Sequence, residues 1–251
     1  MIDLTGRRAL VTGGSRGIGA ATARLLAGAG ADVVVGFRSR ESDARAVVDD
    51  LVTRGRRARA IAADLGDRAE ADRLGREAHE FLGGLDIFVG NAGIWPADDV
   101  ALVDMSDAQW RRTMRENVDA VFHSTAAAAR LMADGGRIVL VSSTAGQRGE
   151  AWHADYAASK GAMISLVKSL CIELAPRGIT VNSVAPGWVD TEMTASVLSG
   201  EYRERAARAI PVGRIASADD VAGPVVFLCS AMARHITGEI LNVNGGSVLC
   251  G

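Results

Sequence analysis

Tyr156 and Lys160 are the two residues whose types and spacing point most directly to chemistry. They lie four positions apart in a segment with a helical pattern, so both side chains share one face of the predicted helix. A free tyrosine titrates near pH ~10, and a neighbouring ammonium favours its phenolate form. We therefore expect Lys160 to lower the pKa of Tyr156, so that the phenol can give or take a proton near neutral pH.

Ser143 extends this pair into a possible catalytic set. It follows the β-branched run 138–142, thirteen positions before Tyr156. In open α/β sheets, ligands bind at the carboxyl ends of the strands, so a hydroxyl here could hold the oxygen of a carbonyl substrate. A Tyr-x-x-x-Lys pair alone is common on amphipathic helices, and its meaning depends on the elements around it.

A glycine-rich turn predicts a nucleotide site. The first β-branched run ends at Thr12 and is followed by Gly13, Gly17 and Gly19, which open a helical pattern. Such glycines let the backbone turn sharply and approach a pyrophosphate, and the helix behind them offers free N–H groups. The alternative is a glycine-rich strand–helix turn that binds no ligand.

Two arginines favour NADP(H) over NAD(H). NAD-binding folds usually place an acid at the end of the second strand, on the ribose 2′-hydroxyl. Here that strand ends with Arg38, Asp32 lies at its opposite end, and Arg16 sits in the glycine turn. Guanidinium groups suit a 2′-phosphate because they bind it in a bidentate manner. NAD(H) remains open, since both arginines could simply be solvated.

The remaining elements alternate in a way that predicts the fold. Short β-branched runs begin at about residues 8, 32, 58, 86, 137, 179 and 240, and segments with helical spacing, such as 20–29, 42–53, 69–82 and 108–132, separate them. Repeated β–α alternation predicts a doubly wound α/β fold with a roughly seven-stranded parallel sheet and helices on both faces. We expect one domain over residues 1–251, with a candidate helical lid at about 188–214.

Composition excludes several other classes of protein. The 251 residues are 48% hydrophobic and 23% charged, with a net charge of −2, which disfavours disorder and a bulk surface for nucleic acid. No apolar run is long enough to span a membrane, and the N-terminus lacks a signal-peptide pattern. The three cysteines are far apart in the sequence and indicate no disulfide framework: Cys171, Cys229 and Cys250. The histidines are dispersed as well, and their spacing indicates no metal site. We expect a cytoplasmic protein without metal, nucleic-acid or membrane partners.

The ordered set of motifs resembles the short-chain dehydrogenase/reductase family over essentially the whole chain. The matching residues, besides the glycine turn, are Asn91-Ala92-Gly93, Asn117, Ser143, Tyr156, Lys160, Pro186-Gly187 and the final segment 236–246. One departure is Gly90, where members often have asparagine. The resemblance implies an NAD(P)-dependent oxidoreductase and a homotetramer built through helices near 126–129 and 165–174; the alternative for these helices is ordinary packing onto the sheet.

The resemblance also implies a role for each site residue. Tyr156 would be the general acid in reduction, Ser143 would hold the substrate oxygen, Lys160 would bind the nicotinamide ribose, and Asn117 would hold a water that links Lys160 to solvent. The coenzyme would contact Gly13, Ser15, Arg16, Gly17, Ile18, Gly19, Arg38, Asp64, Leu65, Asn91, Ala92, Gly93, Tyr156, Lys160, Pro186, Gly187, Val189 and Thr191. Among these, Asp64 and Leu65 would cap the adenine.

The substrate is less determined than the chemistry. Segments 15–19, 176–182 and 211–214 are most like the 3-oxoacyl-thioester reductase branch, and Arg177 matches a basic position of members that use an acyl carrier protein. Asp134 stands where a basic residue is usual, which argues against docking of an acidic carrier. Trp95, Trp152 and Trp188 could wall an apolar pocket or serve packing, and we expect His153 to line the surface or pocket.

Three functions remain in competition. The first is an NADP(H)-dependent reductase that turns a carbonyl into a secondary alcohol, most like a 3-oxoacyl-thioester reductase. The second is an alcohol, polyol or steroid dehydrogenase of the same family that acts on a small ketone or alcohol. The third is a dinucleotide-binding regulator without turnover, against which the complete set of Asn117, Ser143, Tyr156 and Lys160 argues.

Overall fold

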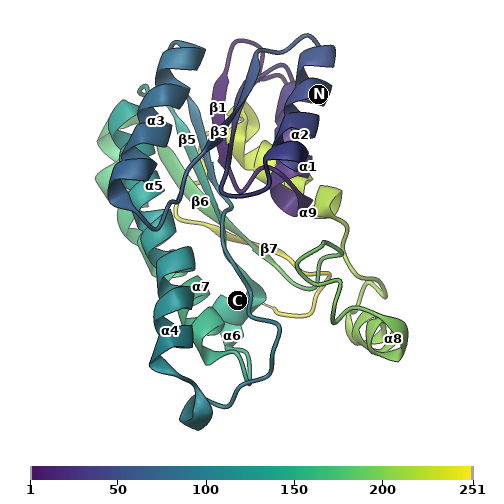
Figure 1. Cartoon of the computed structure of the whole chain (residues 1–251). Helices are drawn as coiled ribbons and strands as arrows, with labels where there is room; N and C mark the ends of the chain where they lie inside the picture. The colour runs from purple at the N-terminus through teal and green to yellow at the C-terminus, as the bar shows by residue number, and fades with distance from the viewer. Residues whose placement is uncertain (1, 250–251) are drawn as a thin grey trace.

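A seven-stranded parallel sheet forms the centre of the computed structural model, which describes residues 2–249 (Figure 1). The strand order is β3-β2-β1-β4-β5-β6-β7, and every neighbouring pair is parallel. The predicted doubly wound fold and its strand number are confirmed. The strands are β1 (Arg8–Thr12), β2 (Asp32–Phe37), β3 (Ala58–Ala62), β4 (Ile87–Gly90), β5 (Arg137–Val141), β6 (Thr180–Pro186) and β7 (Ile240–Val243).

Helices cover both faces of the sheet (Figure 1). One layer holds α1 (Gly17–Gly28), α2 (Glu41–Thr53) and α9 (Ala218–Cys229), and the other holds α3 (Arg68–Leu82), α5 (Ala120–Leu131) and α7 (Ala154–Glu173). The shorter helices α4 (Asp107–Met114), α6 (Thr144–Arg148) and α8 (Gly200–Ala209) lie toward the edge of the sheet where its strands end. The helix expected over 108–132 is interrupted by a π-helical turn at Arg115–Asp119, which joins α4 to α5.

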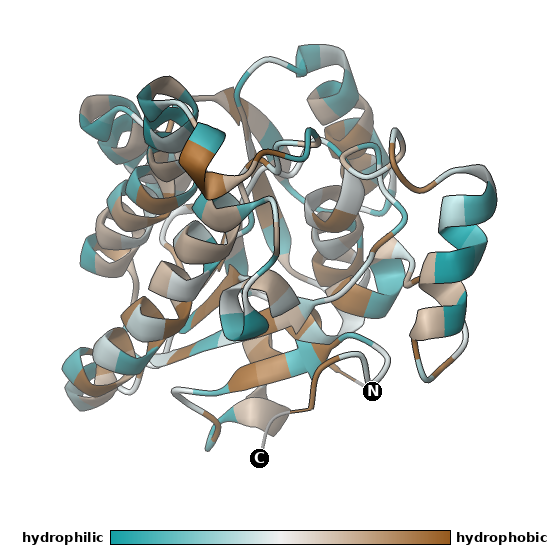
Figure 2. Cartoon of the chain, turned by 90° about the horizontal axis from the view of Figure 1, so that it is seen from below, coloured by the Kyte–Doolittle hydropathy of each residue, from teal (hydrophilic) through white to brown (hydrophobic). Residues whose placement is uncertain are grey.

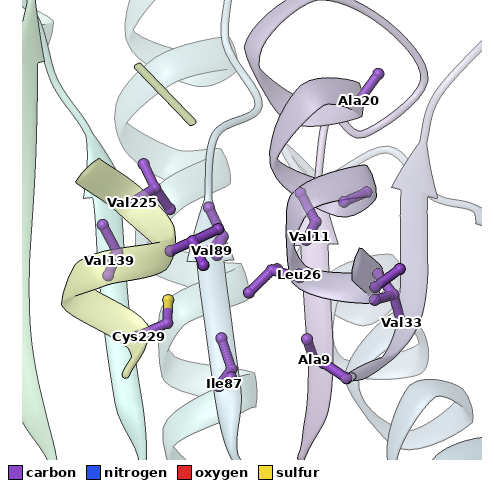
Figure 3. Close-up of a cluster of buried hydrophobic side chains, with 14 of the residues drawn as sticks. Ala9, Val11, Ala20, Leu26, Val33, Ile87, Val89, Val139, Val225 and Cys229 are labelled. Carbon is purple, nitrogen blue, oxygen red and sulfur yellow. The ribbon is translucent and has the colours of Figure 1, made fainter. Parts of the chain in front are cut away.

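The strands are buried on both faces, as their unbroken apolar runs predict. Val33 and Val35 of β2 pack into the core beneath α1, α2 and α9, while Val34 between them packs into the core beneath α3, α5 and α7. Figure 3 shows the first core, where Leu26 of α1 lies between β1 and β4, and Val225 of α9 lies near Val139 of β5 and Val89 of β4. The two cores fix the strand ends in space, and those ends carry the site.

The segment proposed as a lid differs from the layers around it. It contains α8, which projects to one side of the sheet and has hydrophilic residues over much of its surface (Figures 1 and 2). Leu198, Ile210 and Ile215 form a small separate core with the partly buried Trp188. The segment is therefore packed around a small apolar cluster of its own, which is separate from the two main cores.

Membrane-spanning helices and metal-binding groups were both absent from the sequence prediction. Within that range no helix is both long and apolar enough to cross a membrane, and no group of three or more His, Cys, Asp or Glu side chains is placed to hold a metal ion. Cys171 and Cys229 are buried and free. Cys250 lies outside the described residues.

Candidate coenzyme and catalytic site

A cleft opens at the carboxyl ends of β1, β2 and β4. The strands that follow β1 in the chain are added first on one side of it, as β2 and β3, and then on its other side, from β4 onward, and ligands bind at such a switch point. Twelve residues expected to touch the coenzyme line it: Gly13, Ser15, Arg16, Gly17, Ile18, Arg38, Asp64, Leu65, Asn91, Ala92, Gly93 and Thr191. The structure therefore brings together residues from five separate stretches of sequence. Gly19, Tyr156, Lys160, Pro186, Gly187 and Val189 do not line this cleft.

The glycine turn adopts a backbone that side chains would obstruct. Gly13 and Gly17 have φ values of +60° and +52°, in the left-handed region that favours glycine. Gly19 lies under the turn, and a Cβ there would come within 2.3 Å of the Gly13 carbonyl oxygen. No side chain caps the N-terminus of α1, which begins at Gly17, so its first N–H groups are free for an anion.

The turn after β4 is tied directly to the glycine turn. The Asn91 side chain donates to the carbonyl oxygens of Thr12 and Gly13, each at 3.1 Å, and the Thr12 hydroxyl accepts from the Asn91 N–H. A Cβ on Gly90 would lie 2.6 Å from the Leu140 side chain. The departure at Gly90 therefore has a packing reason.

Charged residues surround the adenosine end of the cleft. Arg16, Arg38 and Arg40 line it, and Arg38 forms an ion pair with Glu116. Arg115 donates to Asp64 at 2.8 Å, and this hydrogen bond holds the pKa of Asp64 below its usual value. The predicted arginines do lie at the cleft, and a carboxylate that the sequence interpretation missed faces one of them.

Two of the four catalytic candidates bond to each other, and the other two face Gly93. Ser143 caps the N-terminus of α6, and its side chain hydrogen-bonds to the phenol of Tyr156 on α7. A Cβ on Gly93 would lie 2.9 Å from Asn117 Oδ1 and 3.6 Å from Lys160 Nζ, so both polar atoms face the backbone of the cleft wall. The four side chains expected to act together are thus neighbours in space.

Lys160 and Asn117 are held by the surrounding backbone. Lys160 is 5% exposed, and its Nζ donates to the Val141 carbonyl oxygen at 2.9 Å. Asn117 is fully buried in the π-helical turn, where it accepts from the Ile94 N–H at 2.7 Å and donates to Ser159 Oγ at 2.9 Å. The unusual turn therefore aims the amide at α7.

The expected lowering of the Tyr156 pKa is wrong for this structure. Burial raises the pKa of Tyr156 above its ordinary value; the Ser143 hydrogen bond opposes this, and the charge of Glu150 adds to it. The Lys160 ammonium donates to the Val141 carbonyl oxygen, lies 5.7 Å from the centroid of the Tyr156 ring, and is not among the groups that lower the pKa of the phenol. Burial also lowers the pKa of Lys160 to about 8. The pair here is a protonated phenol beside a readily deprotonated amine.

Aromatic side chains adjoin the catalytic residues. Trp95 stacks on His153 at 5.0 Å and meets Trp188 edge-on at 5.7 Å, whereas Trp152 is 57% exposed. Two of the three predicted tryptophans therefore share one cluster, and Trp152 lies outside it. His153 is buried, so its predicted surface position is wrong, and its pocket-lining position stays a prediction.

A half-buried carboxyl joins this cluster. The Trp95 side chain hydrogen-bonds to Glu150, and burial raises the pKa of that carboxyl. Glu150 is also close enough to Tyr156 for its charge to raise the phenol's pKa. The sequence interpretation missed Glu150, and its position six residues before Tyr156, just ahead of α7, was the available signal.

The other predicted positions have structural partners outside the cleft. Gly187 packs against Asn244, where a Cβ would lie 3.2 Å from the asparagine side chain, and Val189 forms an isolated bridge with Ala216. Pro186 ends β6. The sequence interpretation missed further cleft residues, none of which belongs to a motif: Gly36, Phe37, Ser39, Arg40, Ala63, Gly66, Leu74, Ile94, Glu116, Ala120, Glu192 and Met193.

Arg177, the candidate contact for an acyl carrier, is occupied within the chain. Its Nε donates to Asp134 at 3.0 Å, and its Nη1 donates to the Ala129 carbonyl oxygen at 2.6 Å. The acidic residue that argued against carrier docking thus pairs with the basic residue that favoured it. Together they leave little net charge at this point of the surface.

Known proteins share this fold and sequence. Residues 13–247 match the family described as enoyl-(acyl carrier protein) reductase. The 3-oxoacyl-(acyl-carrier-protein) reductase FabG of Aquifex aeolicus is 40% identical over 248 residues, and the FabG of Escherichia coli is 40% identical over 247, each match covering 98% of both chains.

Solved structures of other proteins also resemble this chain. A short-chain dehydrogenase from Burkholderia cenocepacia in complex with NADP has a TM-score of 0.92 and 42% identity, over 97% of this chain and 98% of its own. A blue fluorescent protein from a metagenomic library in complex with NADPH has a TM-score of 0.93 and 40% identity, over 98% of this chain and 100% of its own. Sequence, fold and the arrangement of the motifs all agree, and the chain belongs to the short-chain dehydrogenase/reductase family.

Proposed function

We propose that this protein is an NADP(H)-dependent oxidoreductase that reduces a carbonyl to a secondary alcohol. The observation that carries this is the hydrogen-bonded Ser143–Tyr156 pair, with the Lys160 ammonium 5.7 Å from the centroid of the Tyr156 ring and facing Gly93 of the cleft wall. Relatives that are named 3-oxoacyl reductases, and neighbours solved with NADP or NADPH, support it.

The cleft fits a dinucleotide with a 2′-phosphate. The free N-terminus of α1 suits the pyrophosphate, and Arg16 and Arg38 suit the additional phosphate. Asp64 and Leu65 would lie at the adenosine, and Lys160, whose Nζ faces Gly93 of the cleft wall, would bind the nicotinamide ribose. When bound, the nicotinamide supplies the hydride, and the protein supplies orientation and proton transfer.

Each catalytic side chain has a task that its environment supports. Ser143 holds the substrate oxygen, and Tyr156, whose raised pKa keeps the phenol protonated, donates the proton as that oxygen gains charge. This protonation state favours the reductive direction. Asn117, fixed between Ile94 and Ser159, holds a water through which Lys160 exchanges protons with solvent.

Replacing Tyr156 with phenylalanine tests this mechanism. Loss of the proton donor should lower kcat/KM for NADPH oxidation by about 10²-fold or more, with NADPH binding retained. The panel would contain 3-oxoacyl thioesters, diketones and simple ketones, and fluorescence titration would measure coenzyme binding. Near-normal turnover by the variant would contradict the proposal. Tight NADPH binding without turnover of any panel member by the wild-type protein would favour a regulator.

Two substrate classes are consistent with the site. Similarity to FabG favours a 3-oxoacyl thioester, and the Arg177–Asp134 pair favours a thioester that is not presented by an acidic carrier. Glu150 favours the second class, a small hydroxy ketone or polyol, because a carboxyl beside the phenol can accept a hydrogen bond from a substrate hydroxyl. The same panel separates the two classes.

Further proposals concern the organisation of the protein. The single domain, the lid around α8 and the homotetramer remain predictions. Exposed apolar side chains on α5 and α7, Phe122 and Ile172, support the predicted subunit contacts. The cytoplasmic location also stays a prediction.

A further inference from the structure

Glu116 and Arg38 meet across the adenosine end of the cleft. Arg38 follows β2, whereas Glu116 belongs to the π-helical turn between α4 and α5, 78 positions later. Their side chains form an ion pair, and both line the cleft. The Glu116 side chain is 17% exposed, so its charge is only partly screened by water.

Glu116 is held from its other side as well. Arg115 contacts Glu116 Oε1 at 3.2 Å and donates to Asp64 Oδ2 at 2.8 Å. Asp64 in turn accepts from the Gly66 N–H at 3.1 Å. Arg38, Glu116, Arg115 and Asp64 therefore form a row of alternating charges, which we call the adenosine-end network. Its formal charge is zero.

NADP and NAD differ at the place where this network lies. NADP carries a 2′-phosphate with a charge of about −2 on its adenosine ribose, and NAD carries a neutral hydroxyl. A carboxylate beside Arg38 competes with the phosphate for the guanidinium donors and repels its charge. The same carboxylate has no comparable effect on a hydroxyl. Glu116 therefore acts on one coenzyme and not on the other.

We propose that Glu116 sets the coenzyme preference of this protein by occupying Arg38. It lowers affinity for NADP(H) relative to what Arg16 and Arg38 alone would give, and it leaves affinity for NAD(H) nearly unchanged. The inference rests on the proposed use of NADP(H). Binding of the 2′-phosphate requires Arg38 to leave Glu116, which then retains Arg115 as its partner.

The substitution must spare the neighbouring Asn117. Glu116 and Asn117 are consecutive, yet one side chain faces the adenosine end and the other faces Ile94 and Ser159. Glu116→Gln keeps the side-chain shape and removes one charge, so the Asn117 contacts should remain. Glu192→Gln is the matched control, because Glu192 also lines the cleft and lies near Gly17, by the part that binds the pyrophosphate shared by both coenzymes.

The experiment measures Kd for NADPH and NADH by fluorescence titration, without substrate, at low and high salt. In Glu116→Gln we expect NADPH to bind about tenfold more tightly at low salt, and NADH to change by less than about twofold. The gain for NADPH should shrink at high salt. Glu192→Gln should shift both coenzymes by the same factor, and circular dichroism would show that each variant is folded.

Other outcomes would overturn the inference. If Glu116→Gln binds NADPH equally or more weakly, Glu116 positions Arg38 rather than competing for it. If NADPH and NADH shift equally, the residue does not discriminate between them. Glu116→Asp, whose carboxylate is retracted by one methylene, should give an intermediate gain and serves if the glutamine variant does not fold. Failure of the wild-type protein to bind either coenzyme would instead refute the proposed function.

Discussion

Lys160→Met should change how the stability of the protein depends on pH. Lys160 is 5% exposed, and burial lowers its pKa from 10.5 to about 8 in the folded state. The unfolded chain should have the ordinary lysine value. Keeping this lysine charged in the folded protein therefore costs free energy, and methionine, which has a similar length, removes that cost.

The pKa difference sets the size and the sign of the effect. At about 1.4 kcal/mol per pKa unit, the fall from 10.5 to about 8 corresponds to about 3 kcal/mol of destabilisation below pH 8. Between about pH 8 and 10.5 the unfolded state binds more protons than the folded state, so stability rises with pH. From pH 7 to 9.5 the free energy of unfolding of the wild type should gain about 2 kcal/mol relative to the variant.

Urea unfolding without coenzyme, at pH 7 and 9.5, measures this difference. The other titrating groups are present in both proteins, and their contributions cancel. Lys168→Met is the control, because Lys168 lies on the same helix and is exposed. Its stability difference from the wild type should not change with pH. A pH-independent difference for Lys160→Met would refute the reasoning, since it would mean that the ammonium is not desolvated.

Two further substitutions test the packing around the site. Gly19→Ala should destabilise the protein by about 1–3 kcal/mol and weaken NADPH binding, because the new Cβ would lie 2.3 Å from the Gly13 carbonyl oxygen. Gly28→Ala on the same helix meets no atom within 4 Å and should stabilise by about 0.5 kcal/mol; thermal unfolding compares the two, and equal effects would contradict the prediction. Asp155→Ala should cost about 2–3 kcal/mol in chemical denaturation, since it leaves the buried Thr113 hydroxyl, now bonded to Asp155 at 2.6 Å, without its acceptor. A loss near zero would show that Thr113 finds another partner.

Much of the fold was predictable because local pattern and burial agree. Val33, Val34 and Val35 are apolar without alternation, and the structure buries all three, on alternating faces of one strand. The glycine turn was equally predictable, because few residues other than glycine adopt the backbone conformation of Gly13 and Gly17. The interruption of the helix at Arg115–Asp119 was not predictable, because its residues have no pattern that distinguishes a π-helical turn from an α-helix.

The sequence by itself determined the layered fold and the identity of the side chains at the strand ends. These follow from apolar runs, glycines and the spacing of Tyr156 and Lys160, all of which are local properties of the chain. Only the tertiary structure decided the electrostatics. The protonated state of Tyr156, the occupied Lys160 and the pairing of Arg38 with Glu116 depend on burial and on contacts between distant segments. Desolvation and ion pairing act through space, so no spacing along the chain predicts them.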